Sequence, residues 1–392
     1  MKLLAKIVTC PYAFVLWLRN KCYHWGLIKS VMSDIPTISI GNITVGGTGK
    51  TPHTELILRL FSSEVPIAVL SGGYKRATQG FRYVTSQDSA LDAGDEPLQI
   101  KRKFPSVVVA VCTNRIAAIK RIAHDHPQIK LIVLDDAFQY RKLKPTYSIL
   151  LSDYARPFTR DLLLPFGRLR DLPSQASRAD MIIVTKCPAN LTPADRRMQQ
   201  QTLRPLPHRP LLFTTLTYGT PQSIAASPPQ SIATSQQSVT NSPRQSVISA
   251  EIITASQQSV TNSLRQPITT SSQPQPIASA EIIALTGIAQ PKPFLQEIGK
   301  SGLIVQHLHF RDHHNFTQKD IARINSAAVQ HPHAVIFTTE KDAMRLLNAP
   351  SLTPKAKAAL FYIPIQAEFY TAGELNHFTS LTAAQFHHVT PL

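Results

Sequence analysis

The sequence predicts an α/β protein with a mostly parallel sheet and a second, smaller α/β domain. Apolar runs of strand length alternate with helical patterns from Pro36 onward, which indicates a sheet covered by helices on both faces. Hydrophobic residues make up 43% of the 392 residues, enough for the cores of two ordinary domains. The four cysteines lack CxxC spacing, so we expect reduced thiols rather than disulfides or a zinc site.

The first thirty residues predict a membrane-interacting amphipathic segment. Residues 3–18 are mostly apolar, but Lys6 and Pro11 interrupt them. As a helix they would span about 24 Å, less than the roughly 30 Å of a hydrocarbon core. Aromatic and cationic side chains then mix, as suits the headgroup region of a bilayer; they are Trp17, Arg19, Lys21, Tyr23, Trp25 and Lys29. We expect residues 1–30 to lie at the membrane interface, ahead of the alternatives of packing on their own domain or of spanning the bilayer.

Residues 31–221 are predicted to form the larger domain. Six apolar runs in this segment have the length and composition of buried strands; they are residues 35–40, 66–71, 106–111, 130–136, 147–153 and 180–186. Helical patterns lie between several of these runs, as in residues 51–61 and 114–124. This alternation is typical of a parallel sheet built from strand–helix–strand units.

The composition changes after residue 221. Residues 222–280 are dominated by Ser, Gln, Pro, Thr, Ala and Ile, and SQQSVTNS occurs there twice. This low complexity predicts a disordered or loosely ordered insertion rather than a folded repeat. Strand patterns return in residues 281–392, which are predicted to form the smaller domain. One of its helices is expected to begin after Thr317, with Asp320 completing a capping box.

The segment GGTGKT, residues 46–51, predicts a nucleotide phosphate loop. It follows an apolar strand and precedes a helical pattern that has Pro52 in its first turn. Backbone N–H groups at such a turn, a lysine and a hydroxyl for Mg²⁺ are what a phosphate cradle needs. The strict pattern has Gly where this chain has Thr44, and an incidental glycine-rich turn is the alternative. We therefore expect a core domain of the P-loop NTPase type. The residues expected to bind ATP and its phosphates are Gly46, Gly47, Thr48, Gly49, Lys50 and Thr51.

Two carboxylates end the apolar run LIVLDD, residues 131–136. In open α/β sheets ligands bind at the carboxyl ends of the strands, so Asp135 and Asp136 are candidate Mg²⁺ ligands opposite the Thr51 hydroxyl. A helix N-cap is the alternative for this pair. The later strand ends in TKCP, residues 185–188, without the aspartate of a guanine-reading Asn-Lys-x-Asp motif. This argues against a GTPase of the switch type.

A kinase also needs a group that orients or deprotonates its acceptor hydroxyl. GDEP, residues 94–97, offers Asp95 and Glu96 in a loop before a helix, and RDHHNF, residues 311–316, offers His313 and His314. A carboxylate from one domain and a histidine from the other would together form a general base. The plainer alternatives are a helix-capping aspartate and a solvated histidine.

The chain is strongly basic, with a formal net charge of +17 from 41 Lys and Arg against 24 Asp and Glu. Such a balance favours an anionic partner, which leaves nucleic acid, an acidic membrane face or a phosphorylated substrate. The sequence lacks a basic repeat interleaved with aromatic residues, so we expect no nucleic-acid partner.

Seven motifs occur in the order seen in the tetraacyldisaccharide 4′-kinases; they are GNITVGGTGKTP, GDEPL, LDDAFQ, LLPFGRLRD, LTGIAQPKPF, DHHNF and TTEKDA. The chain resembles this family over nearly all of its length except the insertion. The resemblance implies transfer of the γ-phosphate of ATP, with Mg²⁺, to the 4′-hydroxyl of a tetraacyldisaccharide 1-phosphate, which forms lipid IVA in lipid A biosynthesis. It also implies peripheral or monotopic attachment to an anionic membrane surface, the cytoplasmic face of the inner membrane. The alternative is a P-loop ATPase switch that binds another anionic partner, such as nucleic acid.

The resemblance assigns roles residue by residue. It implies that Asp95 is the catalytic base and His313 its partner. The remaining matched positions surround the metal and phosphates or neutralise the substrate phosphate; they are Glu96, Asp135, Asp136, Gln139, Arg115 and Arg170. Three positions depart from the family pattern. Gly72 stands where the family often has Arg, Tyr140 where a His commonly follows the glutamine, and Asp171 where Glu follows the arginine.

Overall fold

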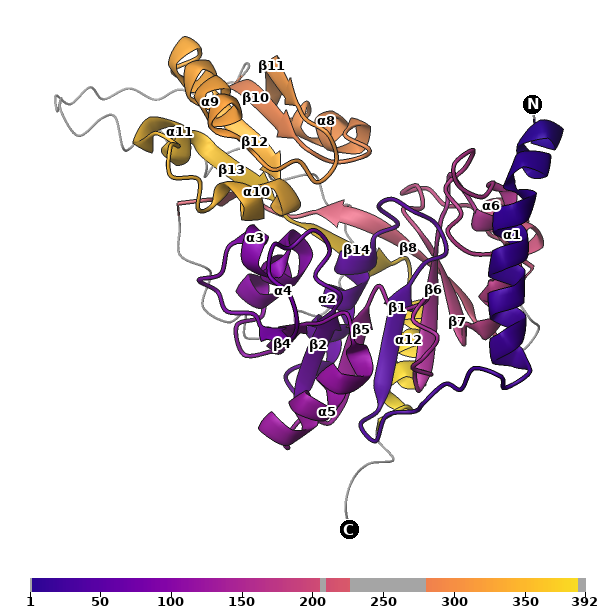
Figure 1. The fold of residues 1–392 in the computed structure, drawn as a ribbon. Coiled ribbons are helices and arrows are strands. Elements are labelled where there is room, and N and C mark those ends of the chain that lie inside the picture. The colour runs from indigo at the N-terminus through magenta and orange to yellow at the C-terminus, as the bar shows by residue number, and fades with distance from the viewer. Residues whose placement is uncertain (1, 205–208, 226–279, 387–392) are drawn as a thin grey trace, which may run out of the picture. The chain divides into compact units, whose positions relative to one another are not determined.

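The computed structural model describes residues 2–204, 209–225 and 280–386 (Figure 1). The chain divides into two compact units. The first unit comprises residues 1–217 and 366–392, and the second comprises residues 218–365. The central part of the predicted insertion, residues 226–279, lies outside the described residues.

The first unit is built on a mostly parallel nine-stranded sheet, which confirms the predicted fold class. The strand order is β14-β8-β7-β6-β1-β5-β2-β4-β3. In chain order the strands are β1 (Thr37–Gly41), β2 (Ile67–Ser71), β3 (Arg82–Tyr83), β4 (Val108–Val111), β5 (Leu131–Asp135), β6 (Tyr147–Asp153), β7 (Met181–Thr185), β8 (Leu211–Tyr218) and β14 (Ile365–Phe369). All six predicted strands are present, and β1 lies between β5 and β6.

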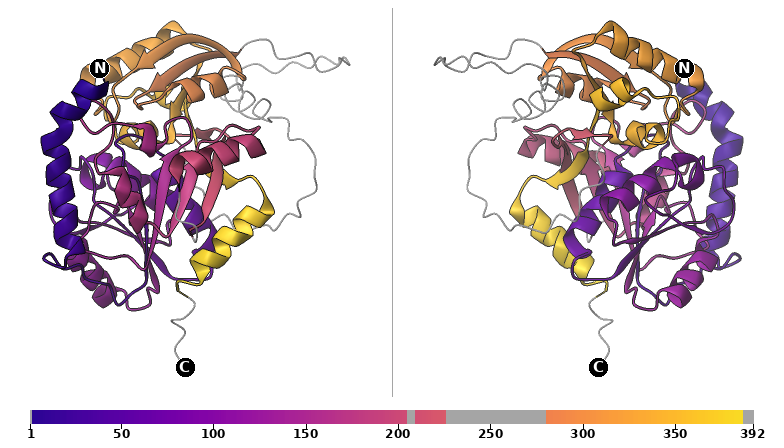
Figure 2. Two further views of the ribbon diagram at one scale, coloured as in Figure 1. Left: turned by 90° about the vertical axis from the view of Figure 1, so that its right-hand side faces the viewer. Right: turned by 90° about the vertical axis from the view of Figure 1, so that its left-hand side faces the viewer.

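Helices cover both faces of this sheet. In β2, Ile67 and Val69 belong to one buried cluster, whereas Ala68 and Leu70 belong to another, because alternate side chains point to opposite faces. The helices of the unit are α1 (Lys2–His24), α2 (Lys50–Phe61), α3 (Ala90–Ala93), α4 (Asp95–Lys103), α5 (Arg115–Asp125), α6 (Pro193–Leu203) and α12 (Ala372–Ala383), with 3-10 turns η1 (Phe158–Arg160) and η2 (Pro173–Arg178). Among the described helices, none is long and apolar enough to cross a bilayer. Helix α1 is continuous through Pro11 (Figure 2).

The C-terminal segment differs from the predicted domain map, which assigned residues 281–392 to the smaller domain. Strand β14 joins the nine-stranded sheet beside β8, and Phe378 of α12 is buried in the core of the first unit. The ring of Phe386 packs edge-on against Phe61, with ring centroids 5.2 Å apart. Periodicity in the sequence predicts that a strand and a helix form, but it does not say which sheet they join.

The second unit contains a five-stranded sheet with the order β11-β10-β12-β13-β9. Its strands are β9 (Gln222–Ser223), β10 (Ala280–Thr286), β11 (Gly302–His309), β12 (Val335–Thr339) and β13 (Leu360–Ile363), and its helices are α8 (Lys292–Ile298), α9 (Gln318–Gln330), α10 (Glu340–Leu346) and α11 (Pro354–Ala359). The capping box predicted at Thr317 and Asp320 is confirmed at the start of α9.

The predicted insertion also started a few residues too early. Gln222 and Ser223 pair antiparallel with β13, and Ile224 is buried. A short strand at the edge of a low-complexity segment has too few residues to change the local composition, so the sequence did not reveal it. Residue Ala280, at the other end of the segment, already belongs to β10.

Candidate active site

The turn between β1 and α2 has the backbone that the predicted phosphate loop requires. Gly46 and Gly49 adopt φ angles of 100° and 85°, which L-residues with side chains rarely adopt. The buried Asn42 donates from Nδ2 to Thr48 Oγ1 over 2.7 Å and so braces the turn from within. Helix α2 begins at Lys50, so its first N–H groups lack partners within the helix and can bind an anion.

Two residues that the sequence did not single out hold this loop in place. His53 is fully buried, and its Nδ1 lies 2.7 Å from the carbonyl oxygen of Gly49 and its Nε2 lies 2.9 Å from Thr214 Oγ1. Burial lowers the pKa of His53 to about 4, so the ring is neutral and donates to the carbonyl. Thr185 Oγ1 donates to the carbonyl oxygen of Thr48 over 2.9 Å. Such long-range supports leave no local signal in a sequence.

Asp136, directly after β5, contacts cations from two helices and a loop. Lys50 Nζ lies 3.6 Å from Asp136 Oδ2, and Arg170 pairs with both carboxylate oxygens. Arg115 donates from Nη2 to the backbone carbonyl oxygen of Asp136 over 2.9 Å. Burial acts to raise the pKa of Asp136, but Lys50 and Arg170 outweigh it and hold this pKa below its ordinary value. The structure thus brings together four of the predicted residues, Asp136 and the three cations that contact it.

Asp135, the last residue of β5, lies in a different environment although it is the neighbour of Asp136. It is fully buried, and the hydroxyls of Thr54 and Ser71 each lie 3.4 Å from one of its carboxylate oxygens. Burial, together with the negative charges of Glu96 and Asp136, raises the pKa of Asp135 to about 7. Burial and the neighbouring negative charges make the ionised form of Asp135 unfavourable, and a nearby cation would stabilise this form. This environment fits the predicted Mg²⁺ role.

The donor set fits Mg²⁺ as it binds in nucleotide sites. Among the described residues, no three His, Cys, Asp or Glu side chains converge to form a complete metal site. Mg²⁺ at a nucleotide site needs only one or two protein ligands, because water and phosphate oxygens supply the others. Asp135 at the end of β5 and Thr51 in the first turn of α2 are oxygen donors of the kinds that P-loop proteins use.

Arg115 is the cation that fits an incoming anion best. It lies at the start of α5 with 5% of its surface exposed, and burial lowers its pKa. Its Nη1 is buried and has no hydrogen-bond partner among the residues that the structure describes. A Cβ atom built on Gly72 would lie 3.6 Å from Arg115 Nη2, so this guanidinium lies beside the position where the family often has arginine. The ring of Tyr140 supports it in a cation–π contact at 5.8 Å.

Gln139 and Arg170 tie the site to the start of the phosphate loop. Gln139 Nε2 donates to the carbonyl oxygen of Asn42 over 2.6 Å. Arg170 Nη2 donates to the same carbonyl over 3.1 Å and to Asn42 Oδ1 over 2.5 Å. Because Asn42 also braces Thr48, both predicted phosphate residues are linked to the conformation of the loop.

Helix α1 contacts the same region through its polar side chains. Arg19 Nη2 donates to the carbonyl oxygen of Gln139 over 2.8 Å, and Tyr12 donates to that of Arg170 over 3.3 Å. Asn20 donates to Asp171 Oδ1 over 3.0 Å in a buried contact. Asp171, where the family has Glu, is therefore a docking point for α1.

Asp95 and Glu96 form the first turn of α4, so the predicted loop position is a helix N-terminus. Asp95 is buried, and its Oδ1 accepts a hydrogen bond from the N–H of Glu96 over 2.9 Å. The carboxylate of Glu96 acts on Asp135 through its charge. Asp95 belongs to the first unit and His313 to the second, so their pairing stays a prediction.

The two histidines of the second unit differ in their contacts. His313 has a φ angle of 56°, and Lys341 Nζ lies 2.8 Å from its Nε2. His314 instead lies 2.9 Å from Asp320 Oδ2 and stacks on Phe310, with ring centroids 5.0 Å apart. His314 therefore supports the start of α9, whereas His313 belongs to a separate arrangement.

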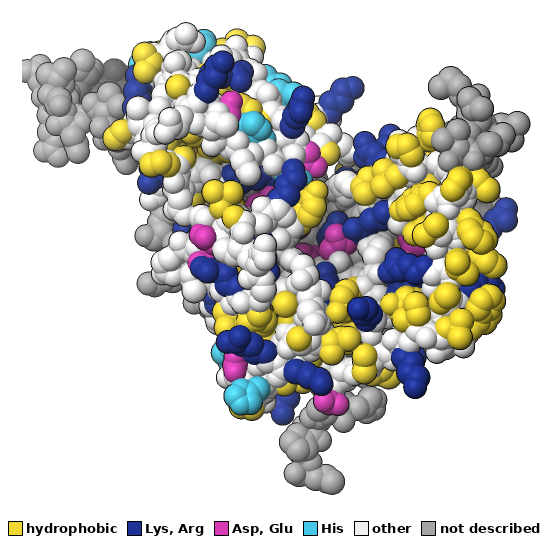
Figure 3. Space-filling model, in the orientation of Figure 1, with side chains coloured by type: hydrophobic (Ala, Val, Ile, Leu, Met, Phe, Trp, Pro, Cys, Tyr) yellow, Lys and Arg dark blue, Asp and Glu magenta, His cyan; other side chains and the backbone are white. Residues whose placement is uncertain are grey.

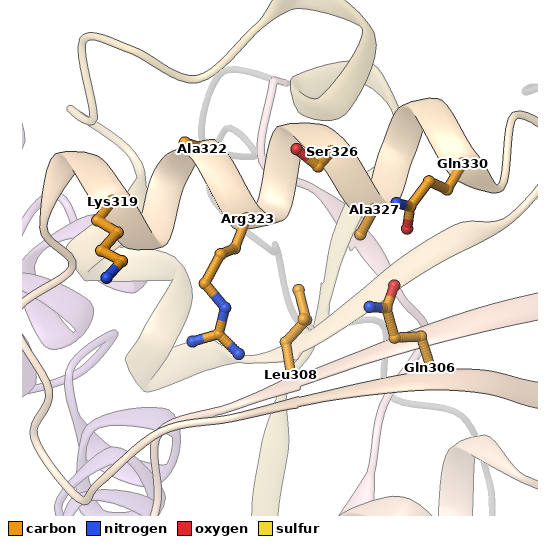
Figure 4. Close-up of a pocket in the computed structure, with 8 residues that line it drawn as sticks. All are labelled: Gln306, Leu308, Lys319, Ala322, Arg323, Ser326, Ala327 and Gln330. Carbon is orange, nitrogen blue, oxygen red and sulfur yellow. The ribbon is translucent and has the colours of Figure 1, made fainter.

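A groove of about 340 Å³ lies between β11 and α9 in the second unit (Figure 4). Its lining residues are Gln306, Leu308, Lys319, Ala322, Arg323, Ser326, Ala327 and Gln330. None of the predicted site residues lines it, so the candidate active site does not depend on it.

The sequence matches a family model over residues 1–382, and that family is described as tetraacyldisaccharide-1-P 4′-kinase. The chain belongs to this family. Tetraacyldisaccharide 4′-kinase of Phocaeicola vulgatus is 37% identical over 370 residues, covering 92% of this chain and 89% of that protein. The same enzyme of Bacteroides thetaiotaomicron is 38% identical over 364 residues, covering 92% and 87%.

A solved structure has the same fold. The LpxK protein of Aquifex aeolicus, crystallised in complex with ATP, superimposes with a TM-score of 0.66 at 20% identity and covers 97% of this chain and 99% of that one. This likeness confirms the α/β architecture, and the family membership identifies the chain as a kinase of lipid A biosynthesis.

Proposed function

We propose that this protein transfers the γ-phosphoryl group of ATP to the 4′-hydroxyl of a tetraacyldisaccharide 1-phosphate and so forms lipid IVA. The observation that carries the proposal is the cluster of Lys50, Arg170 and Arg115 around Asp136 at the phosphate loop. Phosphoryl transfer depends mainly on positioning and on neutralising charge. A site with three cations from two helices and a loop, next to a helix N-terminus, is suited to this task.

The phosphates of ATP bind the loop of residues 46–51 in this proposal. Backbone N–H groups of the turn and of the first turn of α2 donate to the phosphate oxygens, and Lys50 moves from Asp136 to the β- and γ-phosphates. Arg115 offers its buried Nη1 to the transferring or substrate phosphate, where a charge-assisted bond in a dry site is strong. Arg170 and Gln139 keep Asn42 and the loop in place.

Mg²⁺ would be held by Thr51 and Asp135, with Asp136 and Glu96 nearby to bind its water ligands. A bound Mg²⁺ ion supplies positive charge to the β- and γ-phosphate oxygens. The chain's own contribution is the buried, hydroxyl-lined position of Asp135, which keeps this carboxylate oriented. The raised pKa of Asp135 falls when a cation takes the place of its proton.

The acceptor hydroxyl is a poor nucleophile while it keeps its proton. Asp95 accepts this proton as the 4′-oxygen attacks the γ-phosphorus, the bond to the β–γ bridging oxygen breaks, and ADP leaves with that electron pair. His313 orients the Asp95 carboxylate in this proposal and shares its proton. The burial of Asp95 at the start of α4 supports a fixed position for the base.

The lipid substrate reaches this site from a membrane surface, and α1 is the element proposed to bind it. Hydrophobic side chains gather over α1 on the face that Figure 3 shows. The exposed ones in and after this helix are Tyr12, Phe14, Val15, Trp17, Leu18, Trp25, Leu27, Ile28, Val31 and Met32. Lys21 Nζ lies over the rings of both Trp17 and Trp25, 5.9 Å from each centroid, an arrangement suited to anionic headgroups. We place the protein at the cytoplasmic face of the inner membrane.

The test is a phosphoryl-transfer assay with γ-labelled ATP, Mg²⁺ and the detergent-dispersed disaccharide 1-phosphate, with the product located by mass spectrometry and NMR. We expect one new phosphate at the 4′-position. ATP turnover that depends on DNA or RNA and leaves the lipid unlabelled would favour the P-loop ATPase alternative. Label at another hydroxyl would contradict the proposed regiochemistry.

A further inference from the structure

The contact between Lys341 and His313 fixes the chemistry of the histidine ring. Lys341 Nζ lies 2.8 Å from His313 Nε2. An ammonium group has three hydrogen-bond donors and no acceptor, so Nε2 must accept this bond and carry no proton. A neutral imidazole with a bare Nε2 has its proton on Nδ1. His313 is therefore a hydrogen-bond donor through Nδ1 while this contact persists.

The backbone holds His313 in an uncommon conformation for this contact. Its φ angle of 56° lies in the left-handed region, which few residues other than glycine adopt. The N–H of His313 donates to the carbonyl oxygen of Gly287 over 3.2 Å. Such a conformation persists where the surroundings determine it and is common at functional positions.

The same surroundings position Lys341, which is the neighbour of Asp342 in α10. Asp342 is fully buried and accepts hydrogen bonds from the N–H of Gly287 over 2.8 Å and from Thr339 Oγ1 over 2.7 Å. Arg345 balances its charge at 2.8 Å. Gly287 thus binds Asp342 through its N–H and His313 through its carbonyl, and this places Lys341 and His313 on one connected scaffold.

We propose that Lys341 is a positioning residue that holds His313 as the Nδ1–H tautomer. In this state His313 donates a hydrogen bond to a carboxylate, and it is not itself the base. The assignment rests on the proposed function, in which Asp95 is the base that takes the proton of the 4′-hydroxyl. It specifies the form of the His313 ring that acts as the partner of Asp95, which the resemblance leaves open.

The direct test reads the tautomer in the full-length protein without substrate. Long-range ¹⁵N–¹H correlation spectra distinguish protonated from bare ring nitrogens, and a His313→Gln spectrum assigns the signal among the 14 histidines. We expect a bare Nε2 in the wild type and loss of this preference in Lys341→Met. Lys341→Arg, whose side chain has donors and no acceptor, should restore it, whereas Lys355→Met, at an exposed position of α11, should change nothing. An unchanged tautomer in Lys341→Met would overturn the proposal.

Kinetics then test whether the tautomer matters for transfer. We expect Lys341→Met to lower kcat at least about 10-fold, since a wrong histidine tautomer disables a catalytic unit, while KM for ATP changes less than about 2-fold. Lys341→Arg should recover most of this loss. A switched tautomer with unchanged kcat would also overturn the positioning role. Failure of the proposed function would differ, because the wild type would then transfer no phosphate to the lipid although the tautomer still depended on Lys341.

Discussion

The phosphate-loop site of the first unit and the His313 loop of the second differ in how many charged side chains they bring together. In the first unit, Asp136 is surrounded by Lys50, Arg170 and Arg115, and the pKa of Asp135 is raised by burial and by its acidic neighbours. Around the His313 loop, the buried Asp342 is balanced by Arg345 and by hydrogen bonds. The charges of the first site are stabilised when a polyanion and a cation bind, whereas those of the second hold the His313 side chain in one orientation.

This difference suggests a division of labour within one reaction. Groups of the first unit would carry the large electrostatic effects on ATP, and those of the second would contribute through the direction of a single hydrogen bond. Mutations at the phosphate loop and at Arg115 should therefore change binding and catalysis together, whereas mutations of Lys341, His313 and the base Asp95 should change kcat selectively.

Among the substitutions that remove a phosphate or membrane contact, the largest expected effect belongs to the phosphate loop. Lys50→Ala removes the lysine of the phosphate loop and should lower kcat/KM by about 10²–10³-fold, the scale of a lost electrostatic transition-state group. Thr51→Ala should lower kcat/KM by about 10²-fold, because it removes the hydroxyl proposed to bind Mg²⁺. Lys120→Ala, an exposed lysine on α5, is the matched control for general effects of lost charge. Near-normal turnover of the loop variants at saturating MgATP would contradict the phosphate-loop assignment.

Arg115 should show the next largest effect. Arg115→Ala leaves the transferring phosphate without a buried donor, and we expect a loss of about 10–100-fold in kcat/KM. Arg115→Lys should recover only part of the loss, because an ammonium group lacks the planar fork of the guanidinium. If Arg115→Ala affected only the free energy of unfolding and left kcat/KM unchanged, the cation would be structural, and the contrast between the two units would weaken.

Substitutions of the cations in and after α1 of the first unit should have a smaller, salt-dependent effect on membrane binding. Lys21→Gln and Lys29→Gln should each weaken binding to anionic vesicles by about 5-fold at low salt, since each cation near the surface contributes about 1 kcal/mol. Sedimentation with vesicles of phosphatidylglycerol and phosphatidylethanolamine measures this effect, with Lys120→Gln as the control. Equal binding to neutral and anionic vesicles would remove the electrostatic part of the account and leave only the apolar side chains of α1.

The cost of burying Asp135 should appear as a pH dependence of stability. The pKa of Asp135 is about 7 in the folded protein and about 3.9 in an unfolded chain, so the folded state binds its proton more tightly. This contribution to the free energy of unfolding is present at low pH and is lost as the pH rises from about 4 to about 7. Urea denaturation of the nucleotide-free protein measures the free energy of unfolding. That of the wild type should fall relative to that of Asp135→Asn as the pH rises across this window. A difference independent of pH would contradict the environment assigned to Asp135.

Much of the first unit could be predicted from its sequence because its signals are local. The GGTGKT turn, the LDD strand end and the six apolar runs are each contiguous, and all appear where they were expected. His53 and Thr185, which support the loop, act over long sequence distances and gave no such signal. The same holds for β14 and α12, whose patterns are ordinary and whose place in the first sheet depends on tertiary packing.

In the second unit, the motifs indicated the residues but not their arrangement. DHHNF contains two adjacent histidines, and nothing in the pattern shows that His314 contacts Asp320 whereas His313 contacts Lys341. TTEKDA contains Lys341 and the buried Asp342, but the contact of Asp342 with Gly287 connects residues 55 apart in the chain. Such contacts can be read only from the folded structure.

The central claim, that groups of both units act together in one proton transfer, is tested most directly by a double-mutant cycle on kcat with the lipid disaccharide. We expect Asp95→Ala and His313→Ala each to lower kcat by about 10²–10⁴-fold, the usual contribution of a general base, with little change in KM for ATP. The double mutant should be little worse than the poorer single mutant, because groups that act as a unit are non-additive. His314→Ala is the matched control and should retain most of its activity. Fully multiplicative losses in the cycle would mean that Asp95 and His313 act independently, and would contradict the claim.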